Sequence, residues 1–268
     1  LARSLLELIQ MDLFDPLIIK LTLPRRLAPP VKVAGNLVYK LLFRPSRVLA
    51  RVENSGVNGY FALTTGLAAP LDVVYLKNPN KRCKCPSGLF SLKSKEPYTL
   101  ANWSEDTELV WEQFPEQLFT IGPEAINALW QNQFQFKEED SIQGLPGLRK
   151  PQLGALHAIA GYFATDLQVE PATVVLPTGT GKTETMLATM VYQRCGKVLV
   201  IVPSDSLRTQ ISNKFIELGY LPELTVVPRN IALPNVAVIK KGLHQIEDAI
   251  QLASVSNVMV ATTSVLSA

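Results

Sequence analysis

From about residue 148 onward, short apolar runs alternate with amphipathic stretches. Between 151 and 168 the apolar residues recur every three or four positions, a spacing that predicts a helix with one buried face. Apolar runs without polar alternation predict strands at 173–176, 198–202, 236–239 and 258–261. The amphipathic stretches between them predict helices that begin within 181–183, after Ser204 and at Leu243. Strands that are apolar on both faces and alternate with helices are typical of a covered parallel sheet, so we predict a doubly wound α/β domain.

The first 147 residues have a less regular pattern, rich in Pro, Asn and Gly. Strands are predicted at 47–53, 59–64 and 72–76, the first two around a turn. A helix is predicted from Pro123 towards Phe134. We interpret this part as a smaller mixed α/β module of unknown role.

The boundary between the two parts is predicted near residue 147. An acidic run at 138–140 and a turn-rich segment at 144–147 have the composition of a linker. The sequence therefore predicts an accessory module at 1–147 and an α/β domain at 148–268.

Composition narrows the class of protein. A hydrophobic content of 47% allows a packed core and excludes wholesale disorder. The net charge of +3 and the pI near 8.7 are compatible with a nucleic-acid partner. We expect no membrane-spanning helix, because no run of eighteen or more uninterrupted apolar residues occurs, and we expect no secretory signal. Three cysteines are too few for a disulfide scaffold, so we expect a cytoplasmic protein.

The segment Pro177-Thr-Gly-Thr-Gly-Lys-Thr183 has the chemistry of a phosphate-binding loop. Gly179 and Gly181 permit backbone conformations that direct successive N–H groups at one anion. The helix predicted to begin there adds the partial positive charge of its N-terminus. Lys182 is placed to reach the β- and γ-phosphates, and the Thr183 hydroxyl is placed to bind Mg²⁺.

The strict form of this motif has Gly six positions before the lysine, where Leu176 stands. The alternative interpretation is a turn rich in Gly and Thr with an incidental lysine. The predicted strand before the segment and the predicted helix after it favour the phosphate loop. We expect Lys182 and Thr183 to be catalytic, and we expect the nucleotide to contact Pro177, Thr178, Gly179, Thr180, Gly181, Lys182, Thr183 and Glu184.

This loop resembles the Walker A loop of the superfamily 2 helicases and translocases, which include DEAD/DEAH-type enzymes and the motor subunits of type I and type III restriction systems. Three further segments fit this family in order and spacing, so the resemblance covers about 148–268. It implies a RecA-like domain built on a parallel sheet, with ATP and Mg²⁺ as cofactors.

The first further segment is Leu148-Arg-Lys-Pro-Gln152, about thirty residues before Lys182. In the family a similar element reads the adenine base. The amide of Gln152 is able both to donate to and to accept from the adenine edge, and Arg149 is placed to lie over the base. A plain polar residue in the first turn of a helix remains the alternative for Gln152.

The second and third segments resemble the family's motifs Ia and Ib. They are Val202-Pro-Ser-Asp-Ser-Leu-Arg-Thr-Gln210 and Ala261-Thr-Thr-Ser-Val-Leu266, each at the end of a predicted strand. Ordinary helix capping is the alternative for both. The resemblance implies contacts to the nucleic-acid backbone from Ser204, Arg208, Gln210, Thr262 and Thr263.

The family's next element is an Asp-Glu pair that completes Mg²⁺ binding and polarises water. The resemblance implies that this pair and a second motor domain follow Ala268 in a longer protein. We therefore expect the chain to be the N-terminal, ATP-binding part of that protein, and to bind nucleotide weakly without turnover.

The resulting functional prediction is an ATP-dependent helicase or translocase that moves on DNA or RNA, with DNA favoured over RNA. A nuclease or methylase partner subunit is implied by the restriction-type relatives. The alternative is a nucleotide-dependent regulatory ATPase without a nucleic-acid partner.

Overall fold

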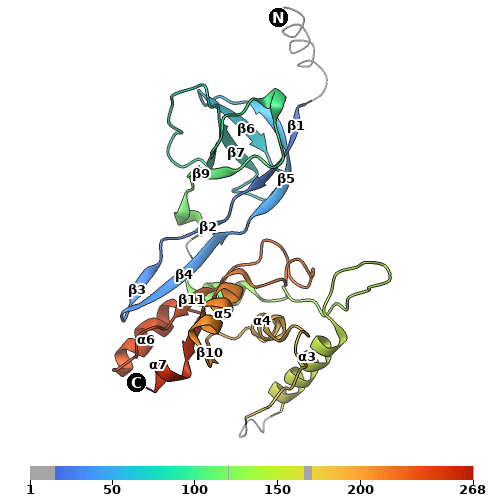
Figure 1. Ribbon diagram of the computed structural model, residues 1–268, viewed down its shortest axis with the longest axis vertical. Coiled ribbons are helices and arrows are strands. Elements are labelled where there is room, and N and C mark those ends of the chain that lie inside the picture. Colours follow the sequence, from blue (N-terminus) through green and yellow to red (C-terminus); the bar gives the residue numbers. More distant parts are fainter. Residues whose placement is uncertain (1–15, 120, 166–170, 268) are drawn as a thin grey trace, which may run out of the picture. The chain divides into compact units, whose positions relative to one another are not determined.

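The computed structural model describes residues 16–119, 121–165 and 171–267 as a mixed α/β protein (Figure 1). The chain packs as two compact units. One comprises Leu1–Arg26 and Leu42–Thr120, and the other comprises Leu27–Leu41 and Ile121–Ala268. Residues 27–41 and 121–147 therefore belong to the same unit as the predicted phosphate loop, although we group them by sequence with the accessory module. The functional division at residue 147 stays a prediction.

The first unit contains a six-stranded sheet in the order β1-β5-β6-β7-β8-β9. Its strands are β1 (Ile18–Leu23), β5 (Ser46–Asn54), β6 (Tyr60–Thr64), β7 (Val73–Lys77), β8 (Ser91–Ser94) and β9 (Leu109–Gln113). Neighbouring strands are antiparallel except β7 and β8. The strands predicted at 47–53, 59–64 and 72–76 correspond to β5, β6 and β7 and are confirmed.

Two indole groups join the ends of this sheet. Trp103 Nε1 donates to the carbonyl oxygen of Lys20, and Trp111 Nε1 donates to that of Pro24, each at 2.7 Å. Trp111 belongs to β9, and its partner Pro24 directly follows β1, the strand at the opposite end of the strand order. The two bonds therefore hold the sheet in a curled form.

The second unit contains the sheet β10-β12-β11-β4-β2, with β3 paired to β4. Its strands are β10 (Val198–Val202), β12 (Val258–Thr262), β11 (Asn235–Val238), β4 (Asn36–Phe43), β2 (Arg26–Leu27) and β3 (Val31–Val33). β10, β12 and β11 are parallel, and β4 runs antiparallel to β11. On β4, Lys40 Nζ donates to the carbonyl oxygen of Ile121 at 2.7 Å, and burial lowers the pKa of Lys40 to about 8.

The α/β class is confirmed, but the parallel sheet of a RecA-like domain is not. Only β10, β12 and β11 have the parallel arrangement that the apolar runs predict. The sheet then continues through β4, which lies some two hundred residues earlier in the chain and runs in the opposite direction. A strand from the first part of the chain thus occupies the position beside β11, and no apolar periodicity in the second part indicates this pairing.

The predicted strand at 173–176 is wrong, because this segment forms no strand in the structure. No described strand pairs with it, and Val174 and Val175 are 44% and 85% exposed. A strand needs a neighbour for its N–H and C=O groups, so apolar composition by itself does not form one.

The helices follow the predicted order. They are α2 (Pro123–Leu129), α3 (Lys150–Phe163), α4 (Lys182–Tyr192), α5 (Asp205–Glu217), α6 (Ile246–Val255) and α7 (Thr263–Leu266). α2 ends five residues before Phe134, the end that we predict. α3 ends at Phe163, and the last predicted positions of this helix, 166–168, lie outside the described residues.

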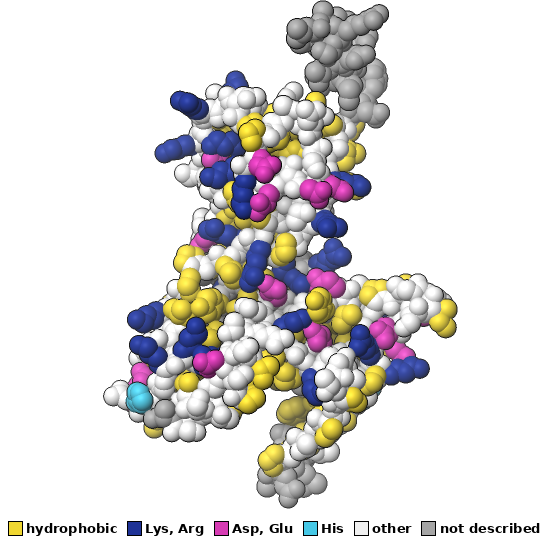
Figure 2. Space-filling view, viewed as in Figure 1, with side chains coloured by type: hydrophobic (Ala, Val, Ile, Leu, Met, Phe, Trp, Pro, Cys, Tyr) yellow, Lys and Arg dark blue, Asp and Glu magenta, His cyan; other side chains and the backbone are white. Residues whose placement is uncertain are grey.

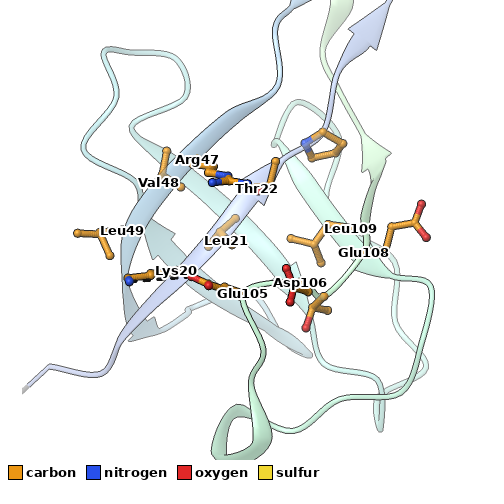
Figure 3. A pocket seen from close by; sticks show the side chains of 12 residues that line it. Lys20, Leu21, Thr22, Arg47, Val48, Leu49, Glu105, Asp106, Glu108 and Leu109 are labelled. Atoms are coloured by element: carbon orange, nitrogen blue, oxygen red, sulfur yellow. Dashed lines mark ion pairs between the residues drawn. The ribbon is translucent and has the colours of Figure 1, made fainter. Parts of the chain in front are cut away.

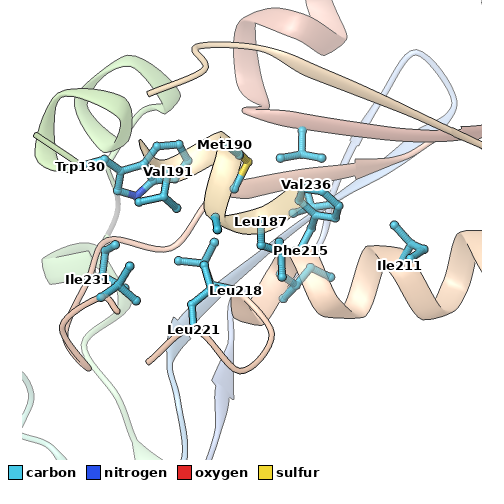
Figure 4. Close-up of a cluster of buried hydrophobic side chains, with 14 of the residues drawn as sticks. Trp130, Leu187, Met190, Val191, Ile211, Phe215, Leu218, Leu221, Ile231 and Val236 are labelled. Carbon is cyan, nitrogen blue, oxygen red and sulfur yellow. The ribbon is translucent and has the colours of Figure 1, made fainter. Parts of the chain in front are cut away.

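The main core of the second unit lies between α4, α5 and the sheet (Figure 4). Side chains spaced at three and four positions on the two helices are buried there, namely Leu187, Met190, Val191, Ile211, Phe215 and Leu218. Trp130, at the end of α2, is also buried, and its Nε1 donates to the carbonyl oxygen of Ala232 at 2.8 Å. This packing holds α4, which begins at Lys182 in the predicted phosphate loop.

In the described part of the chain, no helix has the length and apolar character needed to cross a bilayer. Over the same residues, no three or more His, Cys, Asp or Glu side chains gather as metal ligands.

Candidate nucleotide and nucleic-acid site

Two glycines in left-handed conformations shape the loop that precedes α4. Gly179 has a φ of 83° and Gly181 has a φ of 85°, values that residues other than glycine rarely adopt. A Cβ atom on Gly181 would also lie 2.2 Å from Nε2 of Gln152. Gly181 is the N-cap of α4, and the first N–H groups of a helix have no acceptor within the helix. The loop therefore presents donors and a positive helix end at one place.

Lys182 and Thr180 both bond to the start of this loop. Lys182 Nζ donates to the carbonyl oxygen of Pro177 at 2.8 Å, and Thr180 Oγ1 donates to the same oxygen at 2.7 Å. Lys182 is exposed, and Thr183 beside it is half-buried. The ammonium group of Lys182 thus donates to a neutral carbonyl oxygen of the loop. A phosphate oxygen in its place would be a charged acceptor and would form a stronger hydrogen bond.

The two predicted base-contacting residues hold the loop itself. Gln152 is 4% exposed, and its Nε2 donates to the carbonyl oxygen of Gly181 at 3.1 Å. Its Oε1 accepts from the backbone N–H of Arg149 at 2.8 Å. Arg149 Nη1 donates to the carbonyl oxygen of Gly179 at 3.0 Å. The start of α3 therefore braces both glycines of the loop, and recognition of adenine by these residues stays a prediction.

The carboxylate of Glu184 is engaged in an ion pair within the protein. Its Oε1 lies 3.2 Å from Lys214 Nζ on α5, and the side chain of Glu184 is 14% exposed. The same ammonium group lies 3.8 Å from the ring centre of Tyr220. This ion pair neutralises a negative charge in the first turn of α4, where it would otherwise repel a phosphate.

The predicted nucleic-acid contacts lie where parallel strands end. Ser204 is the N-cap of α5 after β10, and its Oγ accepts from the N–H of Leu207 at 3.3 Å. Thr262 ends β12 opposite the last residue of β10, and Thr263 follows it, exposed to solvent. Ser204 and Thr263 therefore share the carboxyl edge of the sheet, which is the edge where ligands gather in such folds.

Arg208 and Gln210 are placed differently from each other. Gln210 is exposed on α5, whereas Arg208 is only 5% exposed. Nη1 of Arg208 lies 3.1 Å from Asp205 Oδ1, and its Nε has no hydrogen-bond partner among the residues that the structure describes. A phosphate contact from Arg208 stays a prediction, and in the observed rotamer the guanidinium group faces the protein interior.

The sequence motifs do not include one segment at the carboxyl edge of the parallel strands. Lys240 and Lys241 follow β11, which is parallel to β12, and both are exposed. The sequence signal that could have identified this segment is a pair of lysines directly after an apolar strand.

The first unit has a separate pocket of about 550 Å³ beside β1 (Figure 3). Acidic and basic side chains line it together, among them Glu105, Asp106, Lys20 and Arg47. Lys20 Nζ lies 3.9 Å from Glu105 Oε2. None of the predicted site residues lines this pocket.

The comparison with protein families bears on the second part of the chain. Residues 145–263 match the family described as type III restriction enzyme, res subunit. The match includes the loop, the start of α3 and the carboxyl ends of β10, β11 and β12. Searches of curated proteins and of solved structures give no match to the chain.

Proposed function

Because residues 145–263 form a domain of the type III restriction enzyme res-subunit family, a superfamily 2 helicase-like family, we propose that the chain is the ATP-binding part of a DNA helicase or translocase. The observation that carries the proposal is the loop at the start of α4. Gly179 and Gly181 are left-handed there, and Arg149 and Gln152 hold their carbonyl oxygens.

The residues of the loop fit ATP and Mg²⁺. Backbone N–H groups at the start of α4 and the ammonium group of Lys182 would hold the phosphates, and the hydroxyl of Thr183 would bind the metal. Mg²⁺, when bound, would neutralise the charge on the transferred phosphoryl group. Pro177, Thr178 and Thr180 complete the turn, and Arg149 and Gln152 would contact the base.

We propose a RecA-like arrangement around this site. The parallel strands β10, β12 and β11 support it, because their carboxyl ends place Ser204, Thr262 and Thr263 on one edge. DNA would run along that edge, with Arg208 and Gln210 of α5 as further contacts. The description of the matched family as a restriction enzyme subunit supports a nuclease or methylase partner subunit. A cytoplasmic location stays a prediction from the three cysteines.

The first test is ATP turnover by the full-length protein with and without single- and double-stranded DNA and RNA. We expect stimulation by DNA. A rate that none of the four nucleic acids changes would contradict the motor and favour the regulatory ATPase.

The second test is the substitution Lys182→Ala. We expect binding of a fluorescent ATP analogue with Mg²⁺ to weaken about tenfold or more, because hydrogen bonds to charged groups contribute about 1.5–3 kcal/mol. Lys150→Ala is the matched control, since its side chain is 85% exposed at the start of α3. Equal affinities for the two variants would show that the loop is misassigned.

A further inference from the structure

A hairpin from the first part of the chain reaches the carboxyl edge of the parallel strands. β3 and β4 pair as antiparallel neighbours around a turn at Ala34 and Gly35. β4 pairs with β11 in a register that sets Leu37 opposite Val238. The start of β4 and the turn therefore lie where β11 ends, beside the segment that carries Lys240 and Lys241 (Figure 1).

Asn36, the first residue of β4, fixes the backbone of this segment. Its Oδ1 accepts from the N–H groups of Lys240 and Lys241 at 2.8 and 2.9 Å. Its Nδ2 donates to the carbonyl oxygens of Ala34 and Lys241 at 3.1 and 3.2 Å. Asn36 is 2% exposed. A buried amide with both ends engaged holds one backbone conformation, since loss of any bond leaves a buried polar group unsatisfied.

A small hydrophobic core keeps the hairpin in place. Val38 of β4 is buried with Ile239, Leu252 of α6 and Ala261 of β12, and Val33 of β3 packs against them. The hairpin is therefore part of the packed sheet of this unit. The position of Asn36 is set by packing on both sides of the sheet, because Leu41 of the same strand lies in the main core.

The ends of four neighbouring strands now form a row. In the strand order β10-β12-β11-β4, the row carries Ser204, then Thr263, then Lys240 and Lys241, then the hairpin turn, whereas Thr262 is only 1% exposed. Adjacent strands are about 4.8 Å apart, so the row is about 14 Å long.

The charge of this part of the row is positive. Lys240 and Lys241 are exposed, as is Lys32 on β3. Figure 2 shows Lys and Arg side chains gathered over the region of β3, β4 and α6. The nearest acidic residues in sequence, Glu247 and Asp248, lie in the first turn of α6, where the helix N-terminus offsets their charge.

We propose that Lys240 and Lys241 bind the nucleic-acid backbone and that Asn36 is the residue that positions them. The inference rests on the proposed function and extends its nucleic-acid site to a strand from outside the matched family region. The hairpin of β3 and β4 thus belongs to the binding surface.

The first measurement is fluorescence anisotropy of a labelled single-stranded DNA oligonucleotide titrated with the full chain at several salt concentrations. For the double variant Lys240→Ala/Lys241→Ala we expect lower affinity, and a salt slope of log K reduced by about 1.4, the value for two lost phosphate contacts. The control is Arg194→Ala/Arg229→Ala, because both side chains are exposed. It removes the same charge before β10 and β11, away from the carboxyl edge.

The second measurement separates positioning by Asn36 from a general effect on folding. Asn36→Ala should lower DNA affinity in the native background and have no further effect in the double lysine variant. An additional loss there would assign Asn36 a structural role alone and overturn its positioning role. The lysine variants alter only exposed side chains, so they test the surface even where Asn36→Ala unfolds.

The outcomes separate the inference from the proposed function. DNA binding by the native chain, with equal affinity in the lysine variant and its control, overturns the inference and leaves the motor intact. No binding of DNA or RNA by the native chain overturns both. Binding of the ATP analogue should be the same in all of these variants.

Discussion

At the residue scale, the loop predicted to bind phosphate depends on glycine for two separate reasons. Gly181 has a left-handed φ, and the space where its Cβ would lie is taken by Nε2 of Gln152. The first reason was visible in the sequence, because glycine-rich loops need such conformations. The second required the structure, because Gln152 precedes Gly181 by 29 residues.

Gly181→Ala should therefore destabilise the chain and weaken nucleotide binding together. A left-handed conformation costs a residue other than glycine about 1–2 kcal/mol, and displacement of Gln152 removes a bond that braces the loop. The measurement is the free energy of unfolding in urea, together with affinity for the ATP analogue.

Gly161→Ala is the control for this change. Gly161 lies inside α3 with open space around it, so alanine should stabilise the helix by up to about 1 kcal/mol. If both variants unfold at the same urea concentration as the native chain, the loop conformation described here is wrong.

At the scale of elements, helix starts carry most of the candidate chemistry. α4 begins at the phosphate loop, α5 begins at Ser204, and α7 begins after Thr262. Sequence predicts such starts well, because capping residues and the spacing of apolar positions are local signals. It predicts strand partners poorly, as the unpaired segment at 173–176 and the pairing of β4 with β11 show.

Ser204→Ala tests the cap of α5. We expect a loss of about 1 kcal/mol in the free energy of unfolding, because the N–H of Leu207 loses its acceptor. Ser206→Ala is the control, since Ser206 is exposed within the first turn of the same helix. Under the proposed function, Ser204→Ala also lowers DNA affinity, whereas Ser206→Ala leaves it unchanged. The cap assignment fails if the two variants are equally stable.

At the scale of the whole molecule, the compact units do not follow the order of the chain. The second unit takes Leu27–Leu41 from the first part and also includes the segment from Ile121 to α3. Leu41 and Trp130, 1% exposed each, supply side chains to the core that surrounds α4 and α5. A domain defined by the motifs alone, at 148–268, therefore lacks side chains that form part of its hydrophobic core.

A truncated chain of residues 148–268 should consequently fold poorly. It lacks β4 and Trp130, and removal of a buried large side chain typically costs about 3–5 kcal/mol, a large share of the stability of a domain. Thermal unfolding followed by circular dichroism should show no cooperative transition. The full chain is the reference, and a cooperative transition of similar midpoint in both chains would contradict the assignment of β4 and Trp130 to this core.

The sequence by itself determined the order of helices after residue 148 and the match of residues 145–263 to a protein family, and it predicts the phosphate loop. These features depend on neighbours in the chain, so glycine positions, caps and periodicity are sufficient to predict them. The tertiary structure alone decided that Gln152 braces Gly181, that Arg208 is buried, and that Asn36 holds Lys240 and Lys241. Those contacts join residues from different elements, about two hundred positions apart in the case of Asn36, and only the packing of the sheet brings them together.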